Sequence, residues 1–194
     1  MKKLLPFILT ILLANVDLTA QSTWVFDQAH TSVGFSIEHL VISETTGQFT
    51  SFEGTVEASN EDFTDAQINF SVDVSSIDTG NERRDGHLKS DDFFNAEDFP
   101  KMTFKGTTFE KVEGNTYKLI GDLTIRDVTK SIELEVIYKG TAQMGDTQKA
   151  GFKLTGSLNR FDYNLKWSQL TEAGGLVVGE EVTLTVNVEL NQQA

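Results

Sequence analysis

"NTYKLIGDLTIR", residues 115–126, decides the fold class because its apolar residues fall at every second position. Successive side chains of a β-strand point to opposite faces, whereas a helix would repeat about every 3.6 residues. The alternation therefore predicts a strand with one buried face. The residues on that face are Tyr117, Leu119, Gly121, Leu123 and Ile125.

The same alternation recurs on both sides of this segment. Four more faces are clear: Ile68, Phe70, Val72 and Val74; Ile132, Leu134, Val136 and Tyr138; Phe152, Leu154, Gly156 and Leu158; and Val182, Leu184, Val186, Val188 and Leu190. Residues 22–27, 32–41, 47–59 and 101–112 alternate less regularly, and we expect a bulge near Gly106 in the last of them. About nine strands are expected in all.

Long strands with short connections favour an antiparallel meander. A single sheet with so large an apolar face must cover it, and closure into a barrel covers it without leaving open edges. A β-sandwich would explain the alternation equally well. The residue pattern alone predicts an all-β fold and leaves these two architectures open.

The first twenty residues resemble a secretory signal peptide, with Lys2 and Lys3 before an apolar stretch that ends near Leu13. Cleavage after Ala20 would leave residues 21–194 as one domain. The apolar stretch is too short to span a bilayer, so no transmembrane segment is expected in the mature chain. We expect a periplasmic protein, with secretion as the alternative. The net charge of −13 argues against a nucleic-acid partner.

Motifs that carry chemistry are scarce. The chain has no cysteine and no G-x-S-x-G, H-E-x-x-H, phosphate-loop or calcium-loop pattern. His30, His39 and His87 are the only histidines, and their spacing argues weakly against a shared zinc site. We therefore expect no enzyme activity, no catalytic residue, no metal and no cofactor.

One segment departs from the strand pattern. Residues 79–82 match the S/T-x-x-E capping box, which predicts a helix from about Gly80 to Lys89. Phe93 and Phe94 follow and are too apolar to remain in water. We expect a short helical insertion near residues 80–90 whose far end is buried as a plug.

The stretch "SIDTGNERRDGHLKSDDFFNAEDFPKMTF" resembles the signature of the YceI-like family of exported lipid- or polyisoprenoid-binding proteins. Supporting motifs are "FDQAHTSVGFSIEHL", "GQFTSFEG", "GDLTIRDVTKSIEL" and "AGFKLTGSLNRFDYNL", which together cover nearly all of residues 24–190. The resemblance implies a lipocalin-like antiparallel barrel of about eight strands, an apolar cavity for a long-chain amphiphile and no shared catalytic activity. Asp127 and Asn164 stand where relatives often have glycine. Aspartate and asparagine tolerate a left-handed backbone better than most residues, so we expect both turns to be kept.

The resemblance implies a ligand that is a polyisoprenoid, a quinone or a fatty-acid derivative. The candidate cavity residues are Phe35, Ile37, Phe70, Val72, Phe93, Phe94, Phe104, Leu119, Leu123, Leu134, Val136, Phe152, Leu154 and Val186. The candidates for the polar head group are Arg83, Arg84 and His87, unless these side chains only pair with acidic residues or a barrel strand. A non-catalytic interaction module with a solid core and an enzyme acting on an isoprenoid are the alternatives, and a homodimer is compatible with an apolar mouth.

Overall fold

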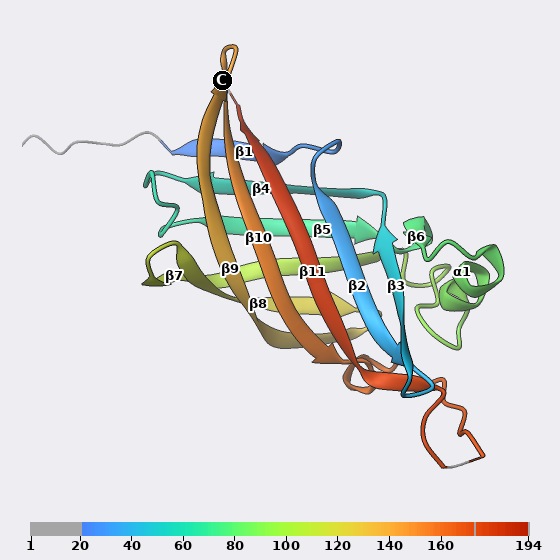
Figure 1. The fold of residues 1–194 in the computed structure, drawn as a ribbon. Coiled ribbons are helices and arrows are strands. Elements are labelled where there is room, and N and C mark those ends of the chain that lie inside the picture. The colour runs from blue at the N-terminus through green and yellow to red at the C-terminus, as the bar shows by residue number, and fades with distance from the viewer. Residues whose placement is uncertain (1–20, 173, 194) are drawn as a thin grey trace, which may run out of the picture.

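The computed structural model describes residues 21–172 and 174–193, so the predicted signal peptide at residues 1–20 lies outside the described residues. Strands dominate the fold, with one α-helix beside them (Figure 1). The strands are β1 (Ser22–Phe26), β2 (Ser32–His39), β3 (Ser43–Phe49), β4 (Phe52–Ala58), β5 (Gln67–Asp73), β6 (Ile77–Asp78), β7 (Lys101–Glu113), β8 (Thr116–Ile125), β9 (Val128–Met144), β10 (Thr147–Asn159) and β11 (Val178–Gln192). The helices are α1 (Glu82–Lys89) and the 3₁₀ turns η1 (Val74–Ser76) and η2 (Arg160–Tyr163).

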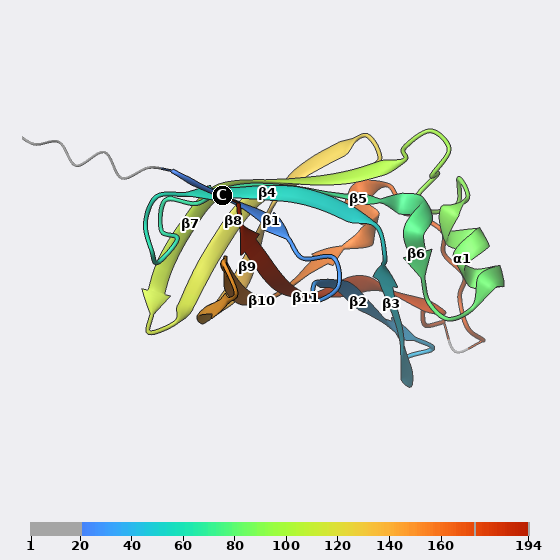
Figure 2. The same ribbon diagram turned by 90° about the horizontal axis from the view of Figure 1, so that it is seen from above.

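Eight of these strands close into an antiparallel barrel. Their order is β1-β4-β5-β7-β8-β9-β10-β11, and β1 also pairs with β11 to complete the ring. Figure 2 shows β4 and β5 on one side of the barrel and β10, β11 and β2 on the other. The predicted barrel is confirmed, and the sandwich alternative is wrong, because closure satisfies both edges of the sheet.

Strand β11 pairs with two strands, β1 and β2, along the same edge. Near its end it pairs with β1, where Phe26 lies opposite Leu190, and further back it pairs with β2, where Phe35 lies opposite Leu184. Strands β2, β3 and β6 therefore continue the sheet beyond the closed ring. This extension forms one wall at the end of the barrel where α1 lies (Figure 1).

The predicted strand faces point inward as expected. Tyr117 and Leu119 of β8 are almost fully buried, as are Val136 of β9 and Leu190 of β11. The pairing of β7 with β8 shifts register between Gly106 and Thr108, which confirms the predicted bulge. The end of the barrel away from α1 is filled by rings: Trp24 and Phe152 each lie 5.1 Å from Phe63, centroid to centroid.

Helix α1 begins two residues later than the capping box predicted. Asn81 is the N-cap, and its side-chain oxygen accepts a hydrogen bond from the Arg84 amide at 3.0 Å. The predicted capping role of Thr79 is wrong, because the Thr79 amide and hydroxyl donate instead to Asp85, at 2.9 and 2.5 Å. Asp85 thus holds the loop before the helix. No helix among the described residues has the length and apolar character needed to cross a membrane.

Both turns that were expected to be kept are present. Asn164 ends η2 with a φ of 62°. In the turn between β8 and β9, the left-handed residue is Arg126, with a φ of 55°, and not Asp127. Arginine occupies this unfavourable region because its side chain is held by four hydrogen bonds to residues 91, 93 and 164.

Candidate ligand-binding cavity

The barrel interior holds an elongated apolar space. An outer cavity of about 620 Å³ lies between β2, β3, β11 and the α1 segment, and an inner cavity of about 150 Å³ lies deeper in the barrel. A third space of about 60 Å³ lies toward the closed end of the barrel, which is the end away from α1 that aromatic rings fill. The outer and inner cavities adjoin each other, because both are lined by Phe35, Phe49, Met102, Ile125, Leu158 and Leu184.

The inner cavity is lined by hydrocarbon. Its wall contains phenylalanine, leucine, isoleucine, valine and methionine side chains, with Gly34 and Thr103 as the exceptions. No ionisable side chain of the described chain lines it. A polar or charged molecule would lose its hydration here without gaining a partner, so this space suits an apolar chain.

The structure places the predicted cavity residues along this whole length. Phe35, Ile37, Phe93 and Phe94 line the outer cavity. Phe70, Val72, Phe104, Leu119, Leu123, Leu134, Leu154 and Val186 line the inner one, with Phe35 shared. Val136 and Phe152 border the small space at the closed end, so they are the furthest from the opening. Contact of any of them with a ligand stays a prediction.

Two glycines give the inner cavity its width. A Cβ at Gly121 would lie 2.2 Å from the Phe104 ring, and one at Gly156 would lie 2.5 Å from the Leu134 side chain. Because neither glycine carries a side chain, the Phe104 ring packs against the neighbouring strand β8, and the Leu134 side chain packs against the neighbouring strand β10. The wall stays thin at these two points.

The outer cavity opens to solvent beside α1, where its lining includes exposed Glu38, Asn81 and Arg83. We call this opening the mouth. All three predicted head-group residues line the outer cavity, but their bonding differs. Arg84 donates to the Thr79 hydroxyl at 2.7 Å and to the Thr79 carbonyl at 2.8 Å, so its guanidinium supports the helix start.

His87 and Arg83 complete the polar side of the mouth. The His87 Nε2 atom lies 2.8 Å from a carboxylate oxygen of Asp92. Arg83 has no hydrogen bond or ion pair with any residue that the structure describes, and it is exposed. Of the three candidates, Arg83 alone therefore has all of its donors available to a ligand.

Three rings lie together at the mouth. His87 is 5.1 Å from Phe93 and 5.4 Å from Trp167, and Phe93 is 5.6 Å from Trp167, all between ring centroids. Trp167 comes from residues 164–177, which connect η2 to β11, so the cluster joins this connection to the α1 segment. Trp167 was not predicted as a cavity residue, because one tryptophan in an irregular segment carries no periodic signal.

Arg160 is a second cavity residue that sequence reasoning missed. It is only 2% exposed, and its guanidinium donates to the carbonyls of Leu165, Trp167, Val178 and Gly179 at 2.6–3.2 Å. No carboxylate of the described chain lies within ion-pair distance of it. Burial lowers the pKa of Arg160, while Glu180 opposes that change. The cavity wall therefore contains a buried cation that holds the Trp167 segment in place.

A buried tyrosine lies behind the mouth. Tyr163 packs with Ile125 and Leu165, and its hydroxyl is buried without a hydrogen-bond partner among the described residues. Burial raises the pKa of Tyr163 to about 12. Its hydroxyl does not line any of the three spaces inside the barrel.

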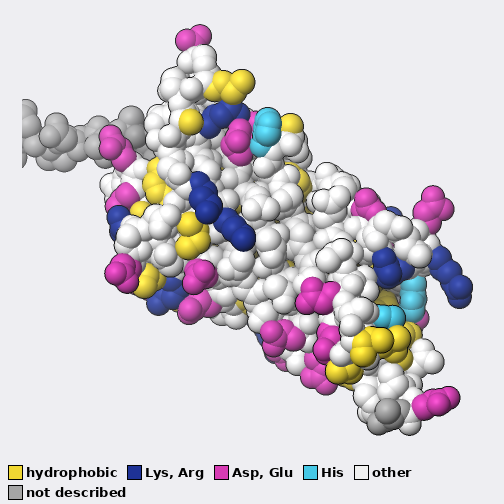
Figure 3. Space-filling model, viewed as in Figure 1, with side chains coloured by type: hydrophobic (Ala, Val, Ile, Leu, Met, Phe, Trp, Pro, Cys, Tyr) yellow, Lys and Arg dark blue, Asp and Glu magenta, His cyan; other side chains and the backbone are white. Residues whose placement is uncertain are grey.

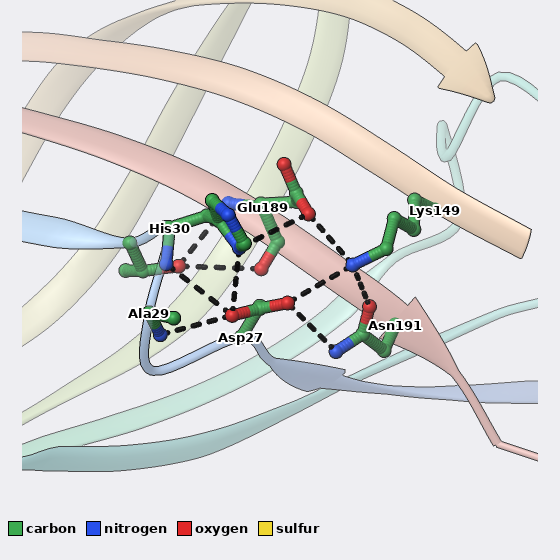
Figure 4. A network of polar contacts seen from close by, with 7 residues as sticks. Asp27, Ala29, His30, Lys149, Glu189 and Asn191 are labelled. Atoms are coloured by element: carbon green, nitrogen blue, oxygen red, sulfur yellow. Dashed lines mark hydrogen bonds and ion pairs between the residues drawn. The ribbon is translucent and has the colours of Figure 1, made fainter. Parts of the chain in front are cut away.

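His30 lies away from the mouth, in a polar network formed by β10, β11 and the turn between β1 and β2 (Figure 4). Asp27, His30 and Glu189 bring their ligand atoms within 4.8 Å of one another, a spacing that a metal ion could use. The Lys149 ammonium already lies among them, 2.9 Å from Asp27 and 2.7 Å from Glu189. The hydrogen bond from Lys149 lowers the pKa of Asp27, so these carboxylates form an ion-pair network with lysine as its cation.

The family model of the YceI-like domain matches residues 24–190. The chain belongs to the YceI-like family. Among curated relatives, the UPF0312 protein SA2479 of Staphylococcus aureus (strain N315) is 36% identical over 172 residues, which are 88% of this chain and 98% of that protein. This YceI-like chain thus matches such relatives over nearly their full length.

Solved structures extend the comparison. The YCEI protein of Campylobacter jejuni superposes with a TM-score of 0.70 at 33% identity, over 87% of this chain and 96% of that one. A polyisoprenoid binding domain from Saccharophagus degradans, implicated in plant cell wall breakdown, superposes with a TM-score of 0.63 over 86% of this chain and 97% of that one. At 16% identity, the second likeness shows a shared YceI-like fold alone.

Proposed function

We propose that this YceI-like protein binds a long-chain amphiphile, with its apolar chain in the inner cavity and its polar end at the mouth. The observation that carries the proposal is the division of polarity between these two adjoining cavities. Every ionisable lining residue of the described chain borders the outer cavity, and the inner cavity is almost purely hydrocarbon. A polyisoprenoid, a quinone or a fatty-acid derivative has the matching shape. The likeness to the S. degradans domain supports a polyisoprenoid.

The driving force for such binding is the removal of apolar surface from water. Each Å² that is buried contributes roughly 25 cal/mol, and this contribution does not depend on the identity of the ligand. The cavity would therefore select ligands by length and width. Aromatic rings such as Phe70 and Phe104 present flat surfaces to unsaturated units of the chain.

The head group is proposed to be anionic. Arg83 lies at the mouth with its donors available, and the buried Arg160 adds positive charge to the same wall. A phosphate or carboxylate would accept hydrogen bonds from the Arg83 guanidinium in a bidentate geometry. Arg84 and His87 already have partners, so they are proposed to position the mouth and not to bind the ligand directly.

The direct test is organic extraction of natively purified protein followed by mass spectrometry of the extract. The proposal expects about one lipid molecule for each protein molecule in the extract. Protein that yields no lipid, and takes up no polyprenyl phosphate or fatty acid added from ethanol, would overturn it.

A second experiment separates head-group binding from support of the fold. Arg83→Ala should weaken binding of a polyprenyl phosphate about tenfold with an unchanged melting temperature, as expected for one charged hydrogen-bonding group. Arg84→Ala should instead lower the melting temperature. Lys153→Ala, on the exposed outer face of β10, removes the same charge far from the mouth and serves as the control.

Two alternatives have weaker support. An interaction module with a solid core does not match an interior that holds cavities of about 620 and 150 Å³. An enzyme acting on an isoprenoid would need ionisable groups beside the chain, and those present border the outer cavity alone. We also propose export to the periplasm, from the basic and apolar pattern of residues 1–20. N-terminal sequencing of the natively expressed protein would test for cleavage after Ala20.

A further inference from the structure

We propose that the protein docks on the surface of an electrically neutral lipid bilayer through four exposed aliphatic side chains beside the mouth. These residues, the apolar rim, are Leu40, Val41, Ile42 and Leu170. The inference rests on the proposed function, because it states where the ligand enters and leaves. It adds a surface and a partner that the cavity alone does not imply.

The apolar rim comes from two segments that contact each other. Leu40, Val41 and Ile42 form the turn between β2 and β3, and Leu170 lies in a small hairpin at residues 169–177. The Leu40 amide donates to the Val177 carbonyl at 2.9 Å and joins the two segments. Both project at the lower right of the molecule in Figure 1, where hydrophobic side chains gather on the surface in Figure 3.

The rim is exposed to an unusual degree. Ile42 is 84% exposed, Leu170 is 64% and Val41 is 62%. The backbone at Leu40 and Val41 has φ values of 55° and 64°, a region that β-branched valine strongly disfavours. The turn therefore carries a conformational cost while it directs apolar side chains into water. Local stability does not explain either feature.

The rim is continuous with the mouth of the cavity. His39 precedes Leu40 and lines the outer cavity, and Val177, which binds the Leu40 amide, lines it as well. Trp167 lines the cavity from the other end of the same connection. A lipid that leaves a bilayer beside the rim would thus reach the cavity without crossing open water.

The size and charge of the rim point to a bilayer. Four aliphatic side chains expose at most on the order of 500 Å², below the about 800 Å² that each partner contributes to a standard protein interface. Residues 38–46 and 168–176 contain glutamates and no lysine or arginine. The rim itself therefore adds no attraction to anionic lipid, and insertion of its aliphatic side chains into the bilayer interface is its contribution to docking.

Flotation with phosphatidylcholine vesicles tests the docking step alone, without any ligand. Wild-type protein should float with the vesicles, and Ile42→Ser/Leu170→Ser should reduce the floated fraction at least about fivefold. The matched control is Val112→Ser/Met144→Ser, which alters side chains that are 65% and 69% exposed away from the mouth. In an Arg83→Ala background, which removes the available cation at the mouth, replacing a third of the lipid with phosphatidylglycerol should not increase binding. Melting temperatures establish that all variants are folded.

A second measurement follows a fluorescent polyprenyl phosphate. The rate of its transfer from vesicles to wild-type protein should rise in proportion to the vesicle concentration. The rim variant, Ile42→Ser/Leu170→Ser, should lose this dependence but should still bind the probe when the probe is added from ethanol. If wild-type protein does not bind the probe added from ethanol, that result counts against the proposed function instead. Absence of wild-type flotation, an equal loss in the control, or a dimer that the rim variant abolishes would overturn docking on a bilayer.

Discussion

The His87 and Trp167 rings meet edge to face with their centroids 5.4 Å apart, although one belongs to α1 and the other to the connection before β11. Phe93 contacts both rings. This contact joins the two segments that border the mouth on opposite sides. A molecule entering or leaving the outer cavity must pass beside it.

Trp167→Ala should therefore accelerate ligand release. Aromatic pairs contribute about 0.5–1.5 kcal/mol each, so loss of two ring contacts predicts a release rate about tenfold higher. Stopped-flow dilution of protein loaded with a fluorescent fatty acid measures this rate. Trp167→Phe keeps a ring at the position and should restore most of the slow release. Equal rates in all three proteins would show that the ring cluster does not limit exit.

Gly121→Ala should narrow the inner cavity. Its Cβ would lie 2.2 Å from the Phe104 ring and 2.7 Å from the Lys105 carbonyl, so the ring must move into the space that the chain would occupy. Overpacking of this kind costs about 1–3 kcal/mol, and bound lipid should become shorter or scarcer. Urea unfolding and mass spectrometry of extracted lipid report the two effects. Gly86→Ala, a helical position with nothing within 4 Å, should instead stabilise α1 by up to about 1 kcal/mol.

Arg126→Ala should loosen the segment after α1. Its guanidinium donates to the Phe93 carbonyl at 2.9 Å and pairs with Asp91 at 3.0 Å, and its side chain is 16% exposed. Removing these partly buried bonds should lower the free energy of unfolding by about 2–4 kcal/mol. Lys130→Ala breaks an exposed pair with Asp162 and should cost at most about 0.5 kcal/mol in the same urea titration. Similar losses in both variants would contradict the assigned role.

Tyr163→Phe should make the protein more resistant to alkali. Burial raises the pKa of Tyr163 to about 12 in the folded chain, whereas an unfolded tyrosine ionises near about 10. Stability is therefore lost as the pH rises from about 10 to 12, because the unfolded chain releases this proton first. The phenylalanine variant should lack that part of the loss in thermal melts between pH 9 and about 12. The pKa of Lys149 is also raised, but Lys149 is present in both proteins, so its contribution cancels in the difference between their stabilities.

Asp27→Asn should flatten the acid limb of the stability curve. The Lys149 hydrogen bond lowers the pKa of Asp27 below its unfolded value of about 3.9, so the ionised carboxylate stabilises the fold above that pH. The contribution is lost as the pH falls through the folded pKa. At pH 7 the variant should be about 1–3 kcal/mol less stable, and this difference should shrink steadily as the pH falls below about 4. Parallel curves would assign the stabilisation to another group.

The strands of the barrel were predictable because burial on one face imposes a period of two, and β8 shows this most clearly from Tyr117 to Ile125. The segment after α1 was also predictable, since Phe93 and Phe94 must leave water. The mouth was not. Arg160 and Trp167 act through contacts with backbone carbonyls and rings that come together only after folding, and such contacts leave no period in the sequence.

The helix start shows a related limit. Thr79 and Glu82 satisfy the capping pattern by spacing, yet Asn81 lies closer to the helix and its short side chain reaches the Arg84 amide. The Arg126 turn was predicted, but the residue that takes its left-handed conformation was not. Its left-handed backbone is stabilised by hydrogen bonds to Asp91 and Phe93, which are distant in the sequence. Local propensity predicts neither outcome.

The pairing of β1 with β11 has a practical consequence for handling the protein. Trp24 lies opposite Gln192, so both ends of the described chain lie together, away from α1 and the mouth (Figure 1). A linker attached after β11 would fix the molecule to a sensor surface with its opening directed outward. Immobilised in this orientation, the protein would remain accessible to vesicles and to free lipid alike.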